Sequence, residues 1–104
     1  EDGLRSMSPT AILVNTGRGE LVDQAALRRA LEEGWIAGAA LDVTTPEPLP
    51  AGDPLLGAPN LTVLPHIGSA SHATREAMAS IAVDNLLAAL ADEPMPHAVV
   101  PSPL

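Results

Sequence analysis

The stretch AILVNTGRGELVDQAALRRALEEGWIAGAALDV, residues 11–43, decides the fold of this chain. It opens with an apolar run over 11–15 and closes with another over 36–43, and the spacing of its apolar residues predicts a helix over 24–33. A third apolar run, LTVLP, occupies 61–65. Strands that alternate with helices are typical of parallel βαβ units. We therefore predict an α/β fold with a parallel sheet.

The predicted helix over 24–33 has recognisable start and stop signals. Asp23 can cap its first turn, and Gly34 can end it. The strand that follows contains no charge before Asp42, which is expected of a strand covered on both faces. The apolar residues on one face of the helix, which should form the core, are Ala26, Leu27, Ala30 and Leu31.

The remaining segments are a loop, a long helix and a tail. Residues 44–60 hold five of the eleven prolines, so we predict an irregular loop of a length that usually serves function. We predict a long helix over 72–91 and an extended, proline-rich tail over 92–104. The predicted apolar stripe of the long helix is Met78, Ile81, Ala82, Asn85, Leu86, Ala89 and Leu90.

Composition excludes several classes of function. The 104 residues carry a net charge of -8 and no lysine, so we expect no binding to nucleic acid or to anionic membranes. No apolar run approaches the roughly 20 residues that span a bilayer. The absence of cysteine fits a reducing compartment, and we expect a cytoplasmic protein without a metal site. Because the chain begins at Glu1, we expect a processed protein or a fragment.

Three polar residues follow the predicted strands closely: Arg18, Glu47 and His66. The carboxyl ends of parallel strands share one edge of a sheet, so these side chains should converge there. Taken singly, each has an ordinary interpretation as a solvated arginine, an exposed loop acid or a hydrogen-bonded structural histidine. Their joint position at one sheet edge favours a functional site.

This set of groups suits the reduction of a carbonyl next to a carboxylate. The guanidinium of Arg18 can grip the substrate carboxylate in one orientation. His66 can donate or accept the proton, and Glu47 can orient His66. A cofactor must supply the hydride. Asp42 could lie against an oxidised nicotinamide.

At these residues the sequence resembles a known family. VNTGRGELVD (14–23), PEP (46–48) and PHIGSA (65–70) strongly resemble the carboxyl-terminal part of the D-isomer-specific 2-hydroxyacid dehydrogenases. Within that family, the glyoxylate and hydroxypyruvate reductases are the most similar branch. The resemblance extends over about residues 4–96.

The resemblance implies the architecture and the activity. Residues 1–71 should be the carboxyl-terminal part of a Rossmann-type, doubly wound parallel sheet, and 72–104 a helix and tail that return to a substrate domain. The implied reaction is hydride transfer between NAD or NADP and a small 2-keto or 2-hydroxy acid, with reduction of glyoxylate or hydroxypyruvate expected. We also expect a homodimer, because the first strand should expose an edge that a full protein would pair and that favours association with another copy.

The resemblance also implies roles for individual residues. Arg18, Glu47 and His66 take the catalytic roles derived above, and Arg18 and Ser69 are expected to contact the substrate. The expected contacts to the nicotinamide cofactor are Thr16, Gly17, Arg18, Asp42, His66 and Gly68.

One departure from the family pattern limits what this chain should do by itself. The G-x-G-x-x-G turn that holds a dinucleotide pyrophosphate is missing, and Gly17-Arg18-Gly19 cannot replace it because Val22 occupies the last position. We expect this turn upstream of residue 1 and expect the isolated fragment to be inactive. Two alternatives remain open, a dinucleotide-sensing corepressor-like interaction protein and a phosphoglycerate-type dehydrogenase.

Overall fold

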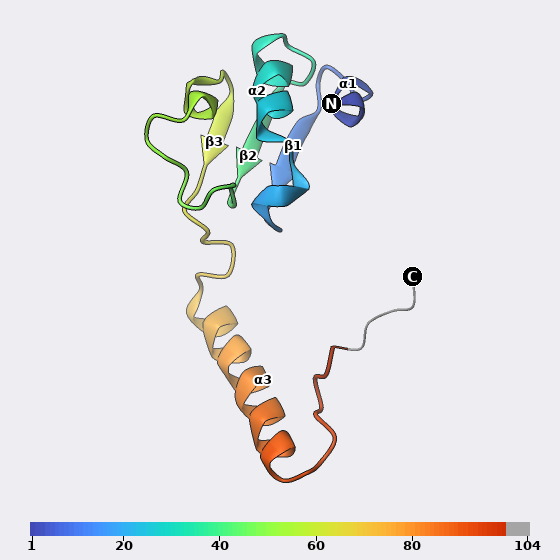
Figure 1. Ribbon diagram of the computed structural model, residues 1–104, viewed down its shortest axis with the longest axis vertical. Helices are drawn as coiled ribbons and strands as arrows, with labels where there is room; N and C mark the ends of the chain where they lie inside the picture. Colours follow the sequence, from blue (N-terminus) through green and yellow to red (C-terminus); the bar gives the residue numbers. More distant parts are fainter. Residues whose placement is uncertain (100–104) are drawn as a thin grey trace. The chain divides into compact units, whose positions relative to one another are not determined.

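The computed structural model describes residues 1–99 and divides the chain into two compact units, Glu1–Gly68 and a second that begins at Ser69. The strands and α2 belong to the first unit, and α3 belongs to the second (Figure 1). In chain order the elements are α1 (Asp2–Arg5), β1 (Ile12–Asn15), η1 (Gly19–Leu21), α2 (Gln24–Glu32), β2 (Gly38–Leu41), η2 (Pro54–Gly57), β3 (Leu61–Val63) and α3 (His72–Leu90).

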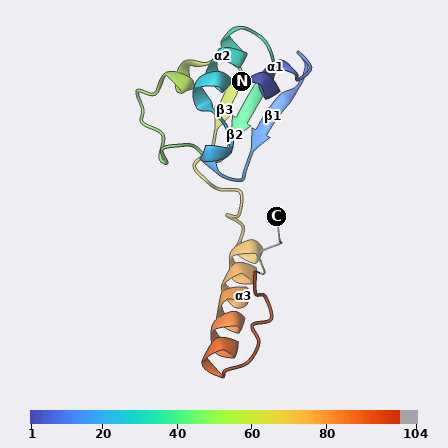
Figure 2. The ribbon, with the colours of Figure 1, turned by 45° about the vertical axis from the view of Figure 1, so that its right-hand side comes forward.

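The three strands form one parallel sheet in the order β1, β2, β3. Asn15 is the partner of Leu41, and Leu41 is the partner of Val63, so the three carboxyl ends lie level. Figures 1 and 2 show the strands side by side with α2 beside the sheet. The α/β fold with a parallel sheet is confirmed.

The core of the first unit lies between α2 and one face of the sheet. All four apolar residues predicted on one face of α2 are buried. Asp23 caps the helix as predicted, since its carboxylate accepts a hydrogen bond from the Ala26 N–H at 3.0 Å. The helix ends just before Gly34, whose φ is 70°. From outside α2 the core takes Leu4, Ile36, Ala39, Leu41, Leu55 and Ala58.

Several boundaries differ from the sequence predictions. The strands are shorter than the apolar runs, and after β3 the chain reaches Pro65, which has no N–H to donate to a neighbouring strand. The prediction that 44–60 is wholly irregular is wrong, since the segment contains η2. The Asp53 carboxylate caps η2 by accepting from the Leu55 N–H at 2.9 Å, and Pro54 is its first residue.

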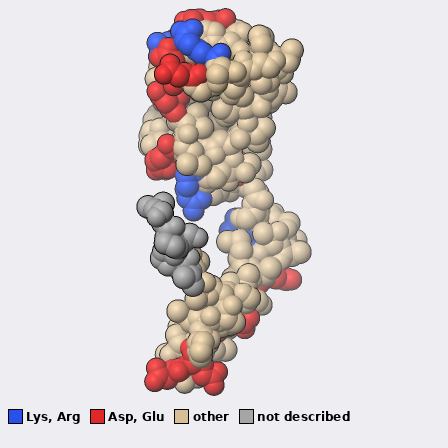
Figure 3. Space-filling view, turned by 90° about the vertical axis from the view of Figure 1, so that its right-hand side faces the viewer, with Lys and Arg blue, Asp and Glu red and all other residues tan. Residues whose placement is uncertain are grey.

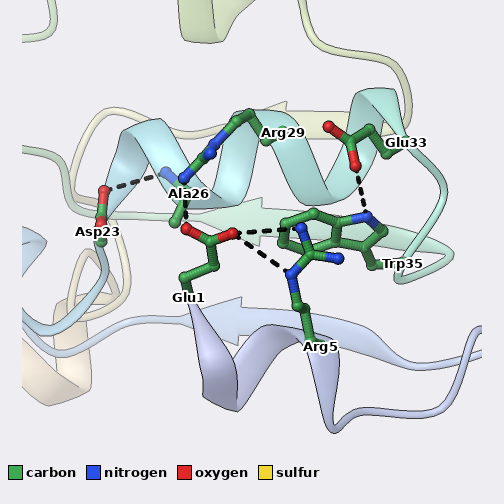
Figure 4. A network of polar contacts seen from close by, with 7 residues as sticks. All are labelled: Glu1, Arg5, Asp23, Ala26, Arg29, Glu33 and Trp35. Atoms are coloured by element: carbon green, nitrogen blue, oxygen red, sulfur yellow. Dashed lines mark hydrogen bonds and ion pairs between the residues drawn. The ribbon is translucent and has the colours of Figure 1, made fainter.

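A network of charged side chains holds α1, which the sequence analysis did not predict, next to α2 (Figure 4). Glu1 accepts hydrogen bonds from Arg5 and from Arg29 of α2. The Arg5 guanidinium lies 3.5 Å from the centre of the Trp35 ring, a cation–π contact. The Trp35 ring N–H in turn donates to Glu33 at 2.9 Å. In Figure 3 acidic and basic groups lie next to each other at one end of this unit.

The outer strand β1 leaves apolar surface open. Ile12 and Val14 point to the same side of the strand and are 66% and 65% exposed. The β1 edge has no strand partner within the described residues. An unpaired, apolar edge is a ready site for pairing with another strand.

In the second unit α3 runs over nearly the predicted range. Ser71 caps it by accepting from the Thr74 N–H at 3.1 Å. The Asn85 side chain bonds to both the N–H and the carbonyl of His97, so this part of the tail turns back toward the helix. No residue of α3 is buried, and Val83 and Leu87, outside the predicted stripe, are also exposed. The last part of the predicted extended tail, residues 100–104, lies outside the described residues.

Within residues 1–99, none of the helices combines the length and the apolar character that crossing a membrane requires.

The packing of α2 can be tested by truncating one side chain. Leu27 is fully buried, so Leu27→Ala should lower the free energy of unfolding by about 2–5 kcal/mol. Leu21→Ala is the matched control because Leu21 is 73% exposed. Urea unfolding followed by circular dichroism gives both values. Similar losses for the two variants would contradict the described core.

Candidate active site

The carboxyl ends of β2 and β3 bring a carboxylate and an imidazole together. Glu47 Oε1 lies 2.5 Å from His66 Nδ1. An ionised carboxylate can only accept, so Nδ1 carries the proton of this hydrogen bond. The Nε2 atom of His66 is thereby left for another partner. Both side chains are about two-fifths exposed, at 42% for Glu47 and 44% for His66.

Local structure after β2 directs Glu47. Thr44 is buried, and its hydroxyl donates to the Pro46 carbonyl at 2.9 Å. Gln24 of α2 bonds to both the N–H and the carbonyl of Thr45. Glu47 itself stands between two prolines, which restrict the backbone on either side. These contacts hold the start of the loop while leaving the Glu47 carboxylate accessible.

Hydrogen bonds to Asp42 determine the turn that carries His66. Asp42 is 5% exposed, and its two oxygens accept from the backbone N–H groups of Ile67 and Gly68 at 2.8 and 2.7 Å. The His66 backbone has a φ of 55°, in the left-handed region that non-glycine residues seldom adopt.

The loop after β1 is held against the end of β2. The buried Asn15 side chain donates to the Arg18 carbonyl at 2.7 Å and accepts from the Gly17 N–H at 3.0 Å. Gly19 packs so closely on Thr44 that a Cβ at this position would lie 2.2 Å from the Thr44 carbonyl. Only glycine allows this approach, which brings the loops of Arg18 and Glu47 together.

A pocket of about 430 Å³ opens at this edge of the sheet, within the range of small-molecule sites. Its polar lining consists of Asp42, Thr44, Glu47 and His66, and its apolar lining is Pro48, Leu49, Leu56, Val63, Leu64 and Pro65.

The structure brings some of the predicted site residues together and not others. Glu47, His66 and Asp42 share the pocket, and Gly68 touches Asp42. Arg18 does not line the pocket; it is exposed, and its guanidinium donates to the Gly17 carbonyl at 2.7 Å. Thr16 is exposed beside it, and Ser69 begins the second unit.

Sequence reasoning missed Thr44 and Asn15, whose side chains anchor the two loops. Both follow apolar strand residues at the point where a chain turns, and a polar side chain there often bonds to the backbone of the loop. That position is the signal that would have identified them. The apolar lining residues Leu49 and Leu56 gave no comparable signal.

The surroundings of Glu47 favour its charged form. The hydrogen bond from His66 holds the pKa of the Glu47 carboxyl below its usual value, with smaller contributions from the Thr44 backbone and from the charges of His66 and Arg18. The positive charge of Arg18 is thus felt at the carboxylate. The arrangement keeps the Glu47 carboxylate ionised and leaves Nε2 of His66 open to a substrate, as an acid–base site requires.

Comparison with known proteins places this fold and site in a class. The model of the D-isomer specific 2-hydroxyacid dehydrogenase NAD binding domain matches residues 1–68. The chain therefore belongs to the D-isomer specific 2-hydroxyacid dehydrogenase family, and the resemblance described above is confirmed.

Similar individual proteins are reductases of small keto acids by name. Glyoxylate/hydroxypyruvate reductase B of Pectobacterium carotovorum is 55% identical over 101 residues, which are 97% of this chain and 32% of that protein. The chain thus spans about a third of the length of the curated relatives it matches.

Solved structures agree with this family. A Thermus thermophilus protein superimposes with a TM-score of 0.83 at 55% identity, over 95% of this chain and 32% of that one. An NADPH-dependent glyoxylate/hydroxypyruvate reductase of Sinorhizobium meliloti, solved with NADP and malonate, superimposes with a TM-score of 0.77 at 41% identity, over 95% and 34%.

The Glu47–His66 contact predicts a measurable titration. Carbon-13 NMR should give a Glu47 pKa below the usual value, and His66→Gln should raise it, because the variant loses the hydrogen bond from Nδ1. The pKa of Asp23, lowered mainly by its bond to the Ala26 N–H, should stay low in both proteins and serves as the control.

The lowered Glu47 pKa determines in which direction the stability of the folded chain changes with pH. Because folding lowers the Glu47 pKa, the contact stabilises the folded chain above the unfolded value of about 4.3. This contribution disappears as the pH falls through the lower folded pKa. A Glu47 pKa that is unchanged by His66→Gln would contradict the contact.

Proposed function

We propose that this chain supplies the acid–base residues of an NAD(P)-dependent reductase that converts a small 2-keto acid, glyoxylate or hydroxypyruvate, into the 2-hydroxy acid. The observation that carries the proposal is the 2.5 Å contact between Glu47 and His66 beside an open pocket. The family membership and the names of the similar proteins support it.

In the proposed reaction His66 is the proton donor. The Glu47 carboxylate accepts from Nδ1 and so fixes the ring, while Nε2 presents the proton to the substrate oxygen. As the keto carbon is reduced, its oxygen gains negative charge and takes this proton. In the reverse direction His66 is the base that removes it.

Arg18 is the proposed anchor of the substrate carboxylate. A guanidinium binds a carboxylate through paired hydrogen bonds, which would also orient the keto group. With Arg18 outside the pocket lining, this role requires its exposed side chain to turn toward the substrate. Ser69 is a further proposed substrate contact.

The residues at the pocket suit the nicotinamide end of the cofactor. The pocket combines an apolar wall with two carboxylates, Asp42 and Glu47, a lining that favours an aromatic ring with a positive charge. We propose that this end of NAD or NADP contacts six residues of the chain: Thr16, Gly17, Arg18, Asp42, His66 and Gly68. The cofactor, when bound, supplies the hydride. No segment of this chain has the glycine pattern that would hold the pyrophosphate.

A chimera tests the proposed function. The 101 matched residues of the Pectobacterium reductase would be replaced by this chain, and glyoxylate-dependent oxidation of NADPH would be followed by absorbance. The chimera should reduce glyoxylate or hydroxypyruvate. His66→Gln should lower its kcat at least about 100-fold, because general acid catalysis typically contributes that much.

His97→Gln is the matched control, since the hydrogen bonds of His97 with Asn85 use its backbone. It should leave kcat nearly unchanged. The free chain should show no turnover, because it lacks the pyrophosphate-binding turn. A folded chimera that is inactive, or one in which His66→Gln keeps full activity, would refute the proposed function.

We propose further that the protein forms a homodimer and works in the cytoplasm. The open edge of β1, with Ile12 and Val14 exposed, supports association of this chain with a second copy. The absence of cysteine is compatible with a reducing compartment.

Analytical ultracentrifugation tests the association. The chain has a mass of 10.6 kDa, and at high concentration it should sediment as a species of about twice that mass. Val14→Lys places a charge on the exposed side of β1 and should shift the chain toward the monomer. A wild-type chain that remains a monomer at every concentration would count against association through this edge.

A further inference from the structure

The turn after β3 holds His66 in an uncommon backbone conformation. Its φ of 55° lies in the left-handed region, although His66 is not a glycine. A residue remains in that region only when the surrounding contacts determine its conformation. The direction of the imidazole depends on this conformation, so the contacts that enforce it also determine whether Nδ1 faces Glu47.

Those contacts come from Asp42 at the end of β2. Its Oδ1 accepts from the Ile67 N–H at 2.8 Å and its Oδ2 from the Gly68 N–H at 2.7 Å. These are the two amides that directly follow His66. We call the two hydrogen bonds the Asp42 clamp. Asp42 is nearly buried, so its carboxylate has few other conformations available.

The lack of a side chain at Gly68 leaves room for the Asp42 carboxylate in this clamp. A Cβ on Gly68 would lie 2.9 Å from Asp42 Oδ2, closer than carbon and oxygen tolerate without a shift. Either the carboxylate or the turn would have to shift to make room for that Cβ. A larger residue at this position would therefore weaken the hydrogen bond from the Gly68 N–H.

We propose that Asp42 is a positioning residue: its clamp on the amides of Ile67 and Gly68 fixes the turn at His66 and so holds the imidazole against Glu47. Sequence reasoning gave Asp42 only a contact to the nicotinamide. The clamp gives it a second role that needs no cofactor. Its importance for catalysis rests on the proposed function, in which His66 is the proton donor.

Two explanations of how Asp42 acts on the site predict different changes in the Glu47 pKa. If Asp42 acts only through its charge, Asp42→Asn removes a negative charge near Glu47 and should lower the Glu47 pKa or leave it unchanged. If the clamp positions His66, the variant should weaken the Glu47–His66 contact and raise the Glu47 pKa toward its usual value, despite the lost charge. The other charged groups that act on Glu47, Arg18 and His66, are the same in both cases.

The experiment measures the Glu47 pKa by carbon-13 NMR in the cofactor-free chain, for wild type, Asp42→Asn and Gly68→Ala. Gly68→Ala disturbs the clamp while the charge of Asp42 remains, and it also covers the case in which Asp42→Asn does not fold. Asp53→Asn is the matched control, because it removes an equal charge from a carboxylate that bonds only to the Leu55 N–H. Hydrogen exchange of the Ile67 and Gly68 amides reports on the clamp itself.

Positioning predicts a raised Glu47 pKa in Asp42→Asn and Gly68→Ala but not in Asp53→Asn. It also predicts that hydrogen exchange becomes at least about tenfold faster at the amide that loses its acceptor in Asp42→Asn, since asparagine offers the Ile67 and Gly68 amides only one, uncharged, oxygen. A Glu47 pKa that falls or stays constant in Asp42→Asn overturns the proposal. If that variant is unfolded, an unchanged Glu47 pKa in Gly68→Ala overturns it instead.

This test is independent of turnover. An inactive chimera together with a raised Glu47 pKa would refute the proposed reductase function and leave the clamp intact. An active chimera together with an unchanged Glu47 pKa would refute the clamp and leave the proposed reductase function intact.

Discussion

The parallel register of the three strands is the constraint on which the rest of the first unit depends. Because Asn15, Leu41 and Val63 lie level across the sheet, the chain leaves all three strands at the same edge. The loops that follow the three strands therefore start next to one another, although tens of residues separate them in the sequence. From that starting point, local bonds of the Asn15 and Thr44 side chains and the bond of Asp42 to the turn after β3 shape the site.

Much of the fold could be predicted from the sequence because its signals are local. The apolar face of α2, its Asp23 cap and its end before Gly34 all follow from the spacing of a few residues, and the structure has them where they were expected. The α1 helix had no such signal. It is four residues long and is held by long-range contacts, above all those of Arg29 with Glu1 and of Trp35 with Arg5.

The candidate site was predictable in its composition but not in its geometry. That Glu47 and His66 would approach each other followed from the edge that the carboxyl ends of parallel strands share. The position of Arg18 outside the pocket lining did not follow, because a long side chain in an exposed loop has many conformations of similar energy. The hydrogen bonds that Asp42 accepts from two backbone amides could not be predicted either, since they depend on the turn that follows β3.

The partial exposure of Glu47 and His66 has a consequence for how protons reach this pair. With more than two-fifths of the imidazole surface open, solvent water reaches the ring directly in the chain as described. A proton given up by His66 can then be replaced from the bulk, without a relay of buried groups.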